Sequence, residues 1–371
     1  MEPSAAAARM ADFARRHVAG RPLWREREFP ADLWSEMRAA GLFGIGLPDG
    51  GYASIAAGDA ALADHGGTPG VAGVWTGHQV VARYMIGGFG TAEQKAAWMP
   101  GLATGALTAC VAISEAGVGA HPKHLSTTAT PIPGGIRLDG AKAWVSNAAL
   151  SDLIIVFAIS ALEGERKRYS AYVVPRDAPG VRLMPGRDIG ALRPSQHAEM
   201  TLEACIVPAE SRLGPAGSAF ETMAMPFRDV EDAVGASGMA GALRHLLRLL
   251  ATATPADRAD DAAPRLGGLA ASIAVAADAA TALAAWLDAQ AWRPGAPPAT
   301  LTGVRLLCAD LLAGMQAYRM DFAPGADDAI DALMRDVALL LNIAKGPRMV
   351  KQGRIGMALL RRPPVAEQQG Q

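Results

Sequence analysis

The spacing of apolar and polar residues divides the chain into three stretches, of which the first, residues 1–107, is helical in character. Gly41 follows an apolar run that carries an acid in its first turn, which marks the end of a helix. Thr91 and Gln94 have the spacing of a capping box, in which each side chain bonds to the other residue's backbone. This stretch is expected to hold helices at Asp32–Ala40 and Lys95–Leu102 and turns at Pro48–Gly51 and Gly66–Gly70.

The second stretch, residues 108–216, breaks into short β-prone runs. Clusters of proline and glycine, as at Pro131–Gly135 and Ala178–Gly180, separate these runs. Short strands at this spacing favour a sandwich or a barrel. The expected strands are Leu107–Ile113, Gly135–Leu138, Leu153–Ile159, Tyr169–Val174 and Ala198–Ala204.

The third stretch, residues 217–371, has helical length and apolar stripes again. Its alanine-rich part, Ala270–Ala285, indicates tightly packed helix, because alanine is the best helix former. The order of helices, strands and helices predicts an α+β fold: an N-terminal helical domain (1–107), a middle β-sandwich or barrel (108–216) and a C-terminal four-helix bundle (217–371). The bundle helices are expected at Phe227–Ala251, Leu266–Gln290, Thr300–Tyr318 and Ala326–Ile343, with connections at Pro255–Pro264 and Arg293–Pro298.

Composition narrows the classes of protein to which the chain can belong. Half of its residues are hydrophobic and its formal net charge is −1, so nothing favours a nucleic-acid partner. The three cysteines lack metal-ligand spacing, which predicts no metal site and a reducing, cytoplasmic location. No signal peptide is evident at the N-terminus. The apolar segment Leu266–Trp286 is interrupted by polar residues, so it is expected to be a buried helix and not a membrane span.

Two segments combine residues suited to binding a flat ring. Ser114–Gly119 places a hydroxyl and a carboxylate at the head of a glycine-containing turn, and Gly140–Asn147 places an indole beside a small hydroxyl. Together they could form the wall and floor of a pocket for a polar, redox-active ring. The alternative is structural: Trp144 would be a core indole and Ser114 a cap at the end of a strand.

These segments, in this order with their neighbours, resemble the acyl-CoA dehydrogenase family. FGTAEQK with WMPGL is similar to the family's entry to its middle domain, AISEAGVGAH to its ALTEPGAGSD motif, and LDGAKAWVSNA to its LNGxKxWITNA motif. Further matches follow at Asp177–Val181, Gly190–Ser195 and Val207–Ala209. The resemblance covers residues 30–250 and implies the three-domain fold described above.

The resemblance implies FAD as cofactor. Ile113 and Ser114 would present backbone and hydroxyl groups to the edge of the flavin, with Gly119 in the same turn. Trp144 would pack on the isoalloxazine and Ser146 would bond near its N5, since a hydride acceptor benefits from a donor at N5 and an aromatic wall excludes water.

The chain departs from the family at the catalytic base. The family has a glutamate in RDAxxxxIYEGT, whereas counting from Arg335 places Ala344 there and aligning on Gly346 places Lys345 there. A thioester α-proton needs a positioned base. Some family members carry that base at the start of the first bundle helix, so Glu231 or Asp229 is the expected replacement. The alternative is a solvated charged turn favoured by the helix dipole.

The contacts to the far half of FAD also depart from the family. Ala120 replaces a serine, and Arg265–Gly267 only faintly resembles RxxFG. The motif QxxGGxG is represented by Gln316 followed by Arg319 and Met320, which lack the glycine pair. Gln316 is nevertheless the expected contact in this segment.

Three functions follow from the resemblance. The first is flavin-dependent α,β-dehydrogenation of an acyl group on CoA or an acyl-carrier protein, with an electron-transfer flavoprotein or oxygen as acceptor. The second is a non-catalytic or half-site subunit of a hetero-oligomer, because the base and part of the FAD site are altered. The third is a flavin oxidase or monooxygenase on the same fold. The family implies a homodimer or homotetramer, or a hetero-oligomer.

Overall fold

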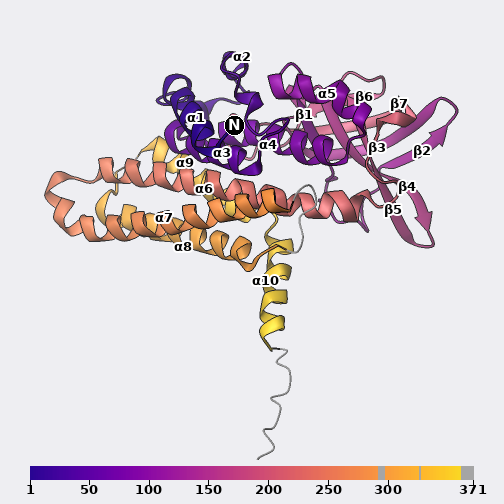
Figure 1. Cartoon of the computed structure of the whole chain (residues 1–371). Helices are drawn as coiled ribbons and strands as arrows, with labels where there is room; N and C mark the ends of the chain where they lie inside the picture. The colour runs from indigo at the N-terminus through magenta and orange to yellow at the C-terminus, as the bar shows by residue number, and fades with distance from the viewer. Residues whose placement is uncertain (291–296, 326, 361–371) are drawn as a thin grey trace, which may run out of the picture.

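The computed structural model describes residues 1–290, 297–325 and 327–360, and within them three regions follow one another along the chain (Figure 1). The N-terminal region is helical, as predicted. Gly41, with φ of 64°, stands between α2 and the next short helix. Its helices are α1 (Pro3–His17), α2 (Ala31–Ala39), α3 (Tyr52–Gly66), α4 (Pro69–Val80), a π-helical continuation (Val81–Gly87) and α5 (Ala92–Thr104). The turn expected over Gly66–Gly70 is shorter, because proline is favoured in a first helical turn and Pro69 begins α4.

The capping box at α5 is confirmed and also joins two regions of the protein. Thr91 Oγ1 accepts from the backbone N–H of Gln94 at 3.2 Å, and Gln94 Oε1 accepts from the N–H of Thr91 at 2.9 Å. The amide nitrogen of Gln94 then donates to the carbonyls of Glu210 and Arg212 in the middle region, at 2.7 and 3.0 Å. One buried side chain therefore both starts α5 and fixes it against the β domain.

The strands of the described residues belong to one sheet, with the order β6-β7-β3-β2-β4-β5-β8 and β1 paired in parallel with β4. Their bounds are β1 Ala109–Ala112, β2 Thr128–Ile132, β3 Gly135–Ser146, β4 Leu153–Glu163, β5 Arg166–Pro175, β6 Val181–Pro185, β7 His197–Val207 and β8 Arg212–Leu213. The hydrophobic pattern does not reveal β2 and β6, whose residues are mostly exposed, or the two-residue β8. Strand β3 runs on past the predicted Leu138 to Ser146, so the tryptophan segment lies on a strand.

Strand β4 lies between two hydrophobic cores. Ile155 and Phe157 on one face join the core shared with the helices, and Ile154 and Val156 on the other join a core enclosed by the β domain. A strand buried on both faces appears in the sequence as a continuous apolar run, which is why Leu153–Ile159 is easy to predict. The β domain is thereby packed against the helices that border it.

In the described part of the C-terminal region, four α-helices pack together and a fifth leaves them (Figure 1). The packed helices are α6 (Met225–Ala253, after a π-helical turn at Phe220–Ala224), α7 (Ala259–Ala289), α8 (Ala299–Phe322) and α9 (Asp328–Asn342). The last helix, α10 (Lys345–Leu360), was not part of the sequence prediction and projects away from the bundle. Part of the connection expected at Arg293–Pro298 lies outside the described residues.

Helix α7 differs from its prediction in two ways. It begins at Ala259 and contains Pro264, so the connection expected over Pro255–Pro264 ends earlier; two acids, Asp260 and Asp261, favour a helix start there. It was expected to be buried, yet only 28% of its most apolar stretch is buried. Among the described residues, Ala256–Ala289 is the one helix that is long and apolar enough to cross a membrane by length and composition, which is weak evidence for a span.

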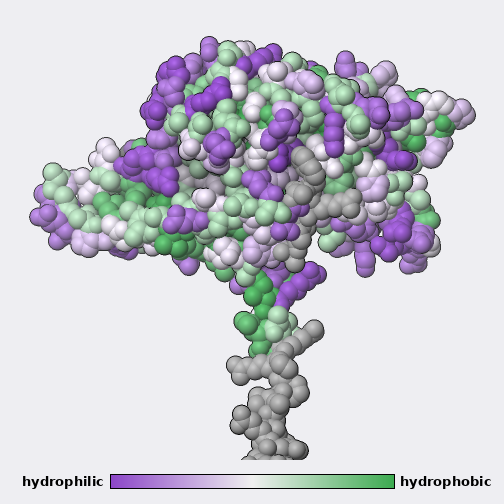
Figure 2. Space-filling view, viewed as in Figure 1, coloured by the Kyte–Doolittle hydropathy of each residue, from purple (hydrophilic) through white to green (hydrophobic). Residues whose placement is uncertain are grey.

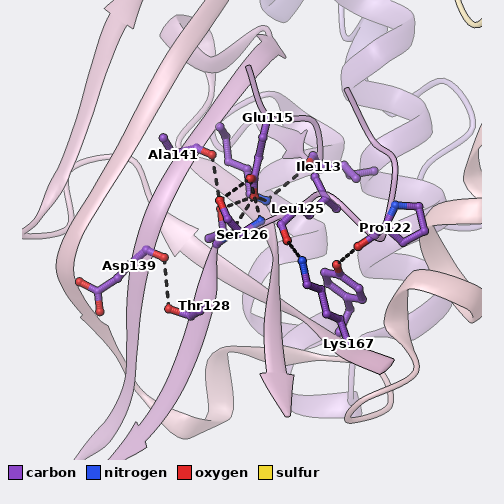
Figure 3. A network of polar contacts seen from close by, with 12 residues as sticks. Ile113, Glu115, Pro122, Leu125, Ser126, Thr128, Asp139, Ala141 and Lys167 are labelled. Atoms are coloured by element: carbon purple, nitrogen blue, oxygen red, sulfur yellow. Dashed lines mark hydrogen bonds and ion pairs between the residues drawn. The ribbon is translucent and has the colours of Figure 1, made fainter. Parts of the chain in front are cut away.

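A buried ion pair between Glu115 and Lys142 joins the two segments that the sequence singled out. Figure 3 shows the polar contacts around Glu115. The side chain of Lys142 is fully buried and that of Glu115 is 7% exposed, and their charged atoms are 3.0 Å apart. Glu115 also accepts hydrogen bonds from the backbone and hydroxyl groups of Ser126 and Thr127, at 2.6–2.9 Å. Lys142 donates to the carbonyl of Ile113 at 3.2 Å. The end of β1, the start of β2 and the middle of β3 therefore meet at one carboxylate.

Glu115 remains ionised because its partners outweigh its burial. Burial alone would raise its pKa, but the hydrogen bonds from Thr127 and Ser126 and the charge of Lys142 hold the pKa at about 2. Burial likewise lowers the pKa of Lys142, while Glu115 acts in the opposite direction. Because the pair is mutually satisfied, removal of either member would leave an uncompensated buried charge.

We expect Gln94→Ala to destabilise the protein more than Thr91→Ala. Loss of the Thr91 hydroxyl removes one cap, worth about 1 kcal/mol. Loss of Gln94 removes the reciprocal cap and leaves the carbonyls of Glu210 and Arg212 without this donor, which costs about 1 kcal/mol more for each. Urea unfolding gives the free energy of unfolding of both variants, with the exposed Ala96→Ser as control. Equal losses of this free energy in Thr91→Ala and Gln94→Ala would contradict the bridging role of Gln94.

We expect Glu115→Gln to lower the free energy of unfolding at pH 7 by about 3 kcal/mol, because it leaves Lys142 buried without its counter-charge. The pKa of Glu115 lies below its ordinary 4.5 in the folded state. Its contribution is therefore complete above about pH 4.5 and declines as the pH falls toward about 2. Unfolding midpoints measured from pH 7 to pH 3 should fall more steeply for the wild type than for Glu115→Gln.

The matched control for this prediction is Asp12→Asn, which removes one member of an exposed ion pair with Arg16. An exposed pair contributes less than about 1 kcal/mol. If Asp12→Asn lowered the free energy of unfolding as much as Glu115→Gln, burial of the Glu115 pair would have no special effect on stability.

Candidate functional site

The backbone conformation of Trp144 turns its side chain toward solvent. It has φ of 60°, a left-handed conformation that is uncommon for a bulky residue, and lies where the pairing of β3 with β7 shifts register. Its neighbours Ala143 and Val145 are buried, whereas Trp144 is 47% exposed. The alternative interpretation of a core indole is therefore wrong. A bulky aromatic residue in a costly conformation that exposes it is an outlier that points to function.

His197 lies beside Trp144 and was not singled out from the sequence. It begins β7, and its ring meets the indole edge-on, with centroids 5.9 Å apart. Its Nδ1 is 2.9 Å from the hydroxyl of Ser146. Burial lowers the pKa of His197, so its ring is neutral at pH 7. The sequence around His197 matches no motif that would single it out. The antiparallel pairing of β3 with β7 brings it beside Ser146.

Ile113, Ser114 and Gly119 lie in the loop beside this strand. The carbonyl of Ser114 accepts from the N–H of Ala143, at 2.9 Å, which places the loop directly against the residue before Trp144. Two backbone hydrogen bonds of 3.0 Å between Glu115 and Gly119 close the turn, and Gly119 adopts φ of 60°. The structure thus brings the two predicted segments together.

Asn147 connects the end of β3 to the N-terminal helices. Its side-chain nitrogen donates to the carbonyl of Val74 in α4 at 2.8 Å, and its own φ is 64°. Its N–H donates to the carbonyl of Gln196 at 3.2 Å, next to His197. The position of Trp144 and Ser146 is therefore fixed on both sides, by the Glu115–Lys142 pair before them and by Asn147 after them.

The two carboxylates expected as base lie on α6 in different surroundings. Asp229 forms an ion pair with Lys351 of α10. Glu231 is 3.4 Å from the guanidinium of Arg228, and its side chain is 40% exposed. Desolvation by the surrounding protein raises the pKa of Glu231, against the charge of Arg228. A carboxylate of raised pKa that retains an accessible face is suited to accept a proton, and Glu231 meets this description.

Asp232, three residues after Asp229, is the buried carboxylate of this turn. Its side chain is 2% exposed and lies 2.6 Å from Arg228 and 3.2 Å from Arg305 of α8. These two cations hold the pKa of Asp232 below its ordinary value despite burial. The helical spacing of Arg228 and Asp232 indicates the first contact, but the second depends on the packing of α8 against α6.

Gln316 lies apart from the ring-binding candidates. It is on α8 and lines a cavity of about 350 Å³ between α8, α9 and α10. Ala344 and Lys345 are the two residues that align with the family's base. Ala344 forms the turn between α9 and α10 with φ of 55°, and Lys345 begins α10 and lines the same cavity. The predicted residues therefore fall into three groups: the β1–β3 surface, the start of α6 and the bundle cavity.

Comparison with known sequences and structures agrees with this arrangement. Two family profiles match, for the acyl-CoA dehydrogenase N-terminal domain over residues 2–106 and for its middle domain over residues 110–205. Human mitochondrial short-chain specific acyl-CoA dehydrogenase is 36% identical over 133 residues, which is 36% of this chain and 32% of the human protein. The match thus spans about a third of the length of that curated relative.

A second curated relative acts on a carrier protein. L-prolyl-[peptidyl-carrier protein] dehydrogenase of Pseudomonas fluorescens is 32% identical over 198 residues, 52% of each chain. Solved structures match over nearly the whole chain. Butyryl-CoA dehydrogenase of Megasphaera elsdenii gives a TM-score of 0.85 at 20% identity, covering 97% of this chain and 98% of that one.

An FAD complex of the protein PigA gives a TM-score of 0.82 at 18% identity, covering 96% of this chain and 97% of that one. At such identities the solved structures show the fold alone, and the matching profiles add the family. With its three regions and the paired segments of its middle domain, the chain belongs to the acyl-CoA dehydrogenase family.

Proposed function

We propose that the protein is an FAD-dependent dehydrogenase that removes hydrogen from the α and β carbons of an acyl thioester, with Glu231 as base. The observation that carries this proposal is Trp144, an exposed indole in a costly backbone conformation beside the Ser146 hydroxyl. Similarity to enzymes acting on acyl-CoA and on a prolyl-carrier protein supports an acyl group on CoA or on a carrier protein as substrate.

The residues of the β3 surface fit a flavin ring. The indole of Trp144 offers an aromatic wall that excludes water, and Ser146 offers a hydroxyl oriented by the neutral ring of His197. Ile113, Ser114 and Gly119 supply backbone and hydroxyl groups from the facing turn. Bound FAD would supply the hydride acceptor for the β carbon. An electron-transfer flavoprotein or oxygen would then take the electrons.

Glu231 is the better of the two candidate bases. The α carbon of a thioester gives up its proton only to a positioned group, and such catalysis contributes about 10²–10⁴ in rate. Asp229 is engaged by Lys351, whereas Glu231 keeps an accessible face and a raised pKa. The pair of electrons from the broken α C–H bond forms the new double bond as hydride leaves the β carbon, so proton and hydride together account for both hydrogens.

The second candidate function is a half-site subunit. Neither Ala344 nor Lys345, the two residues that align with the family's base, is a carboxylate. In addition, apolar side chains of the projecting helix α10 are exposed (Figure 2). The exposed residues are Met349, Val350, Ile355, Met357, Leu359 and Leu360. A partner chain covering α10 would remove this apolar surface from water. A homodimer, a homotetramer or a hetero-oligomer with a glutamate-bearing homologue would each do so.

Trp144→Ala is expected to lower the flavin content of the purified protein, because the ring loses its aromatic wall. Flavin absorbance after reconstitution with FAD measures the content. Leu162→Ala, which truncates another exposed apolar side chain of the β domain, serves as the control and should bind flavin like the wild type. If the wild type stays colourless after reconstitution, the flavoenzyme proposal is wrong.

Glu231→Gln is expected to reduce turnover of acyl thioesters by about 10²-fold or more with unchanged flavin content, because the amide cannot accept the α-proton. Asp229→Asn is the matched control and should keep most of the activity. Since the base must be ionised and its pKa is raised, the wild-type rate should increase with pH through a value above the ordinary glutamate range. Equal losses in both variants would argue against a specific role for Glu231.

A further inference from the structure

Three arginines from three helices converge on a single carboxylate. Arg228 of α6, Arg305 of α8 and Arg348 of α10 lie 2.6, 3.2 and 3.9 Å from the oxygens of Asp232. The side chains of Arg305 and Arg348 are only 13% and 16% exposed. Buried cations are ordinarily each matched by an anion, so three around one acid are an unusual arrangement.

Including the neighbouring charges does not restore the balance. Glu231 pairs with Arg228, and Asp229 pairs with Lys351. Lys345 lines the adjoining cavity. Five cationic side chains thus face three carboxylates, a surplus of about two positive charges. Burial, followed by the charge of Arg305, lowers the pKa of Arg348 to about 10, which is the effect expected where cations crowd together.

The pairing of each guanidinium within the protein is incomplete. The end of α9 fixes both groups, since Arg305 donates to the carbonyl of Leu340 at 2.6 Å and Arg348 to that of Leu341 at 2.9 Å. Within the described residues, the buried Nε of Arg305 and the buried Nε and Nη2 of Arg348 have no hydrogen-bond partner. An unmatched buried donor costs about 1–3 kcal/mol, so these nitrogens add to the cost of burying the cations.

These arginines border a space of suitable size. Arg305, Arg348 and Lys345 line the cavity of about 350 Å³ between α8, α9 and α10, within the range of small-molecule sites. The other polar residues on its wall are Thr302, Gln316, Asn342 and Gln352, and none of them is acidic. The cavity therefore combines a positive surface with additional neutral hydrogen-bonding groups.

We propose that this cavity binds the phosphate or diphosphate group of a ligand through Arg305, Arg348 and Lys345. A phosphate carries close to two negative charges, which match the surplus positive charge of the cluster, whereas a carboxylate carries only one negative charge. The planar fork of arginine pairs with phosphate through two parallel bonds. The residues that carry this proposal lie on α8 and α10, and none of them belongs to the β3 surface around Trp144.

The experiment is calorimetric titration of the full-length protein with inorganic pyrophosphate, as purified and after removal of any bound flavin. Arg348→Gln and Lys345→Gln are each expected to weaken binding about tenfold or more, because each removes a charged donor. Arg354→Gln removes an exposed arginine of the same helix that does not line the cavity, and it should bind like the wild type. Thermal unfolding of each variant checks that the fold is retained, and Lys345→Gln disturbs no pairing with Asp232.

The source of the phosphate follows from the same titrations. Binding that appears only after flavin removal assigns the group to FAD, and binding displaced by CoA assigns it to CoA. Binding in both forms without displacement assigns it to free phosphate. The proposal is wrong if pyrophosphate binds neither form, or if Arg354→Gln weakens binding as much as Arg348→Gln. Neither result bears on the flavin content of Trp144→Ala, so failure here is separate from failure of the proposed function.

Discussion

The buried pair of Glu115 and Lys142 is the interaction on which the arrangement of the middle domain depends. A fully buried ammonium is costly unless it is matched, and Glu115 matches it while also accepting from Ser126 and Thr127. The end of β1, the start of β2 and the middle of β3 must therefore meet at one point. The turn that carries Ser114 then has a fixed place against β3, at the residue directly before Trp144.

The same arrangement explains why a costly conformation persists at Trp144. A left-handed tryptophan costs about 1–3 kcal/mol and survives only when its surroundings determine it. Lys142 anchors the strand before it, and Asn147 anchors the chain after it through the carbonyl of Val74. Pairing with β7 shifts register in between, so the indole is turned outward next to His197. Rigidity on both sides produces a preorganised surface.

The charges in the C-terminal helices are not balanced as they are in the β domain. In the β domain one anion and one cation are fully matched, whereas at the start of α6 the cations outnumber the carboxylates. Ala344 or Lys345, depending on the alignment, stands where the family has a glutamate. Neither residue carries a negative charge, so the excess of cations around Asp232 is left uncompensated by the turn between α9 and α10.

The sequence by itself determined the order of the three regions, the capping box at α5, the strand β4 and the pairing of the Ser114 and Trp144 segments. Each of these depends on local signals or on continuous apolar runs. Only the tertiary structure decided that Trp144 is exposed, that His197 joins it and that Asp232 gathers arginines from three helices. Apart from the pair Arg228–Asp232, these contacts join residues more than about 50 positions apart, and no local pattern encodes which polar side chains meet once helices and strands pack.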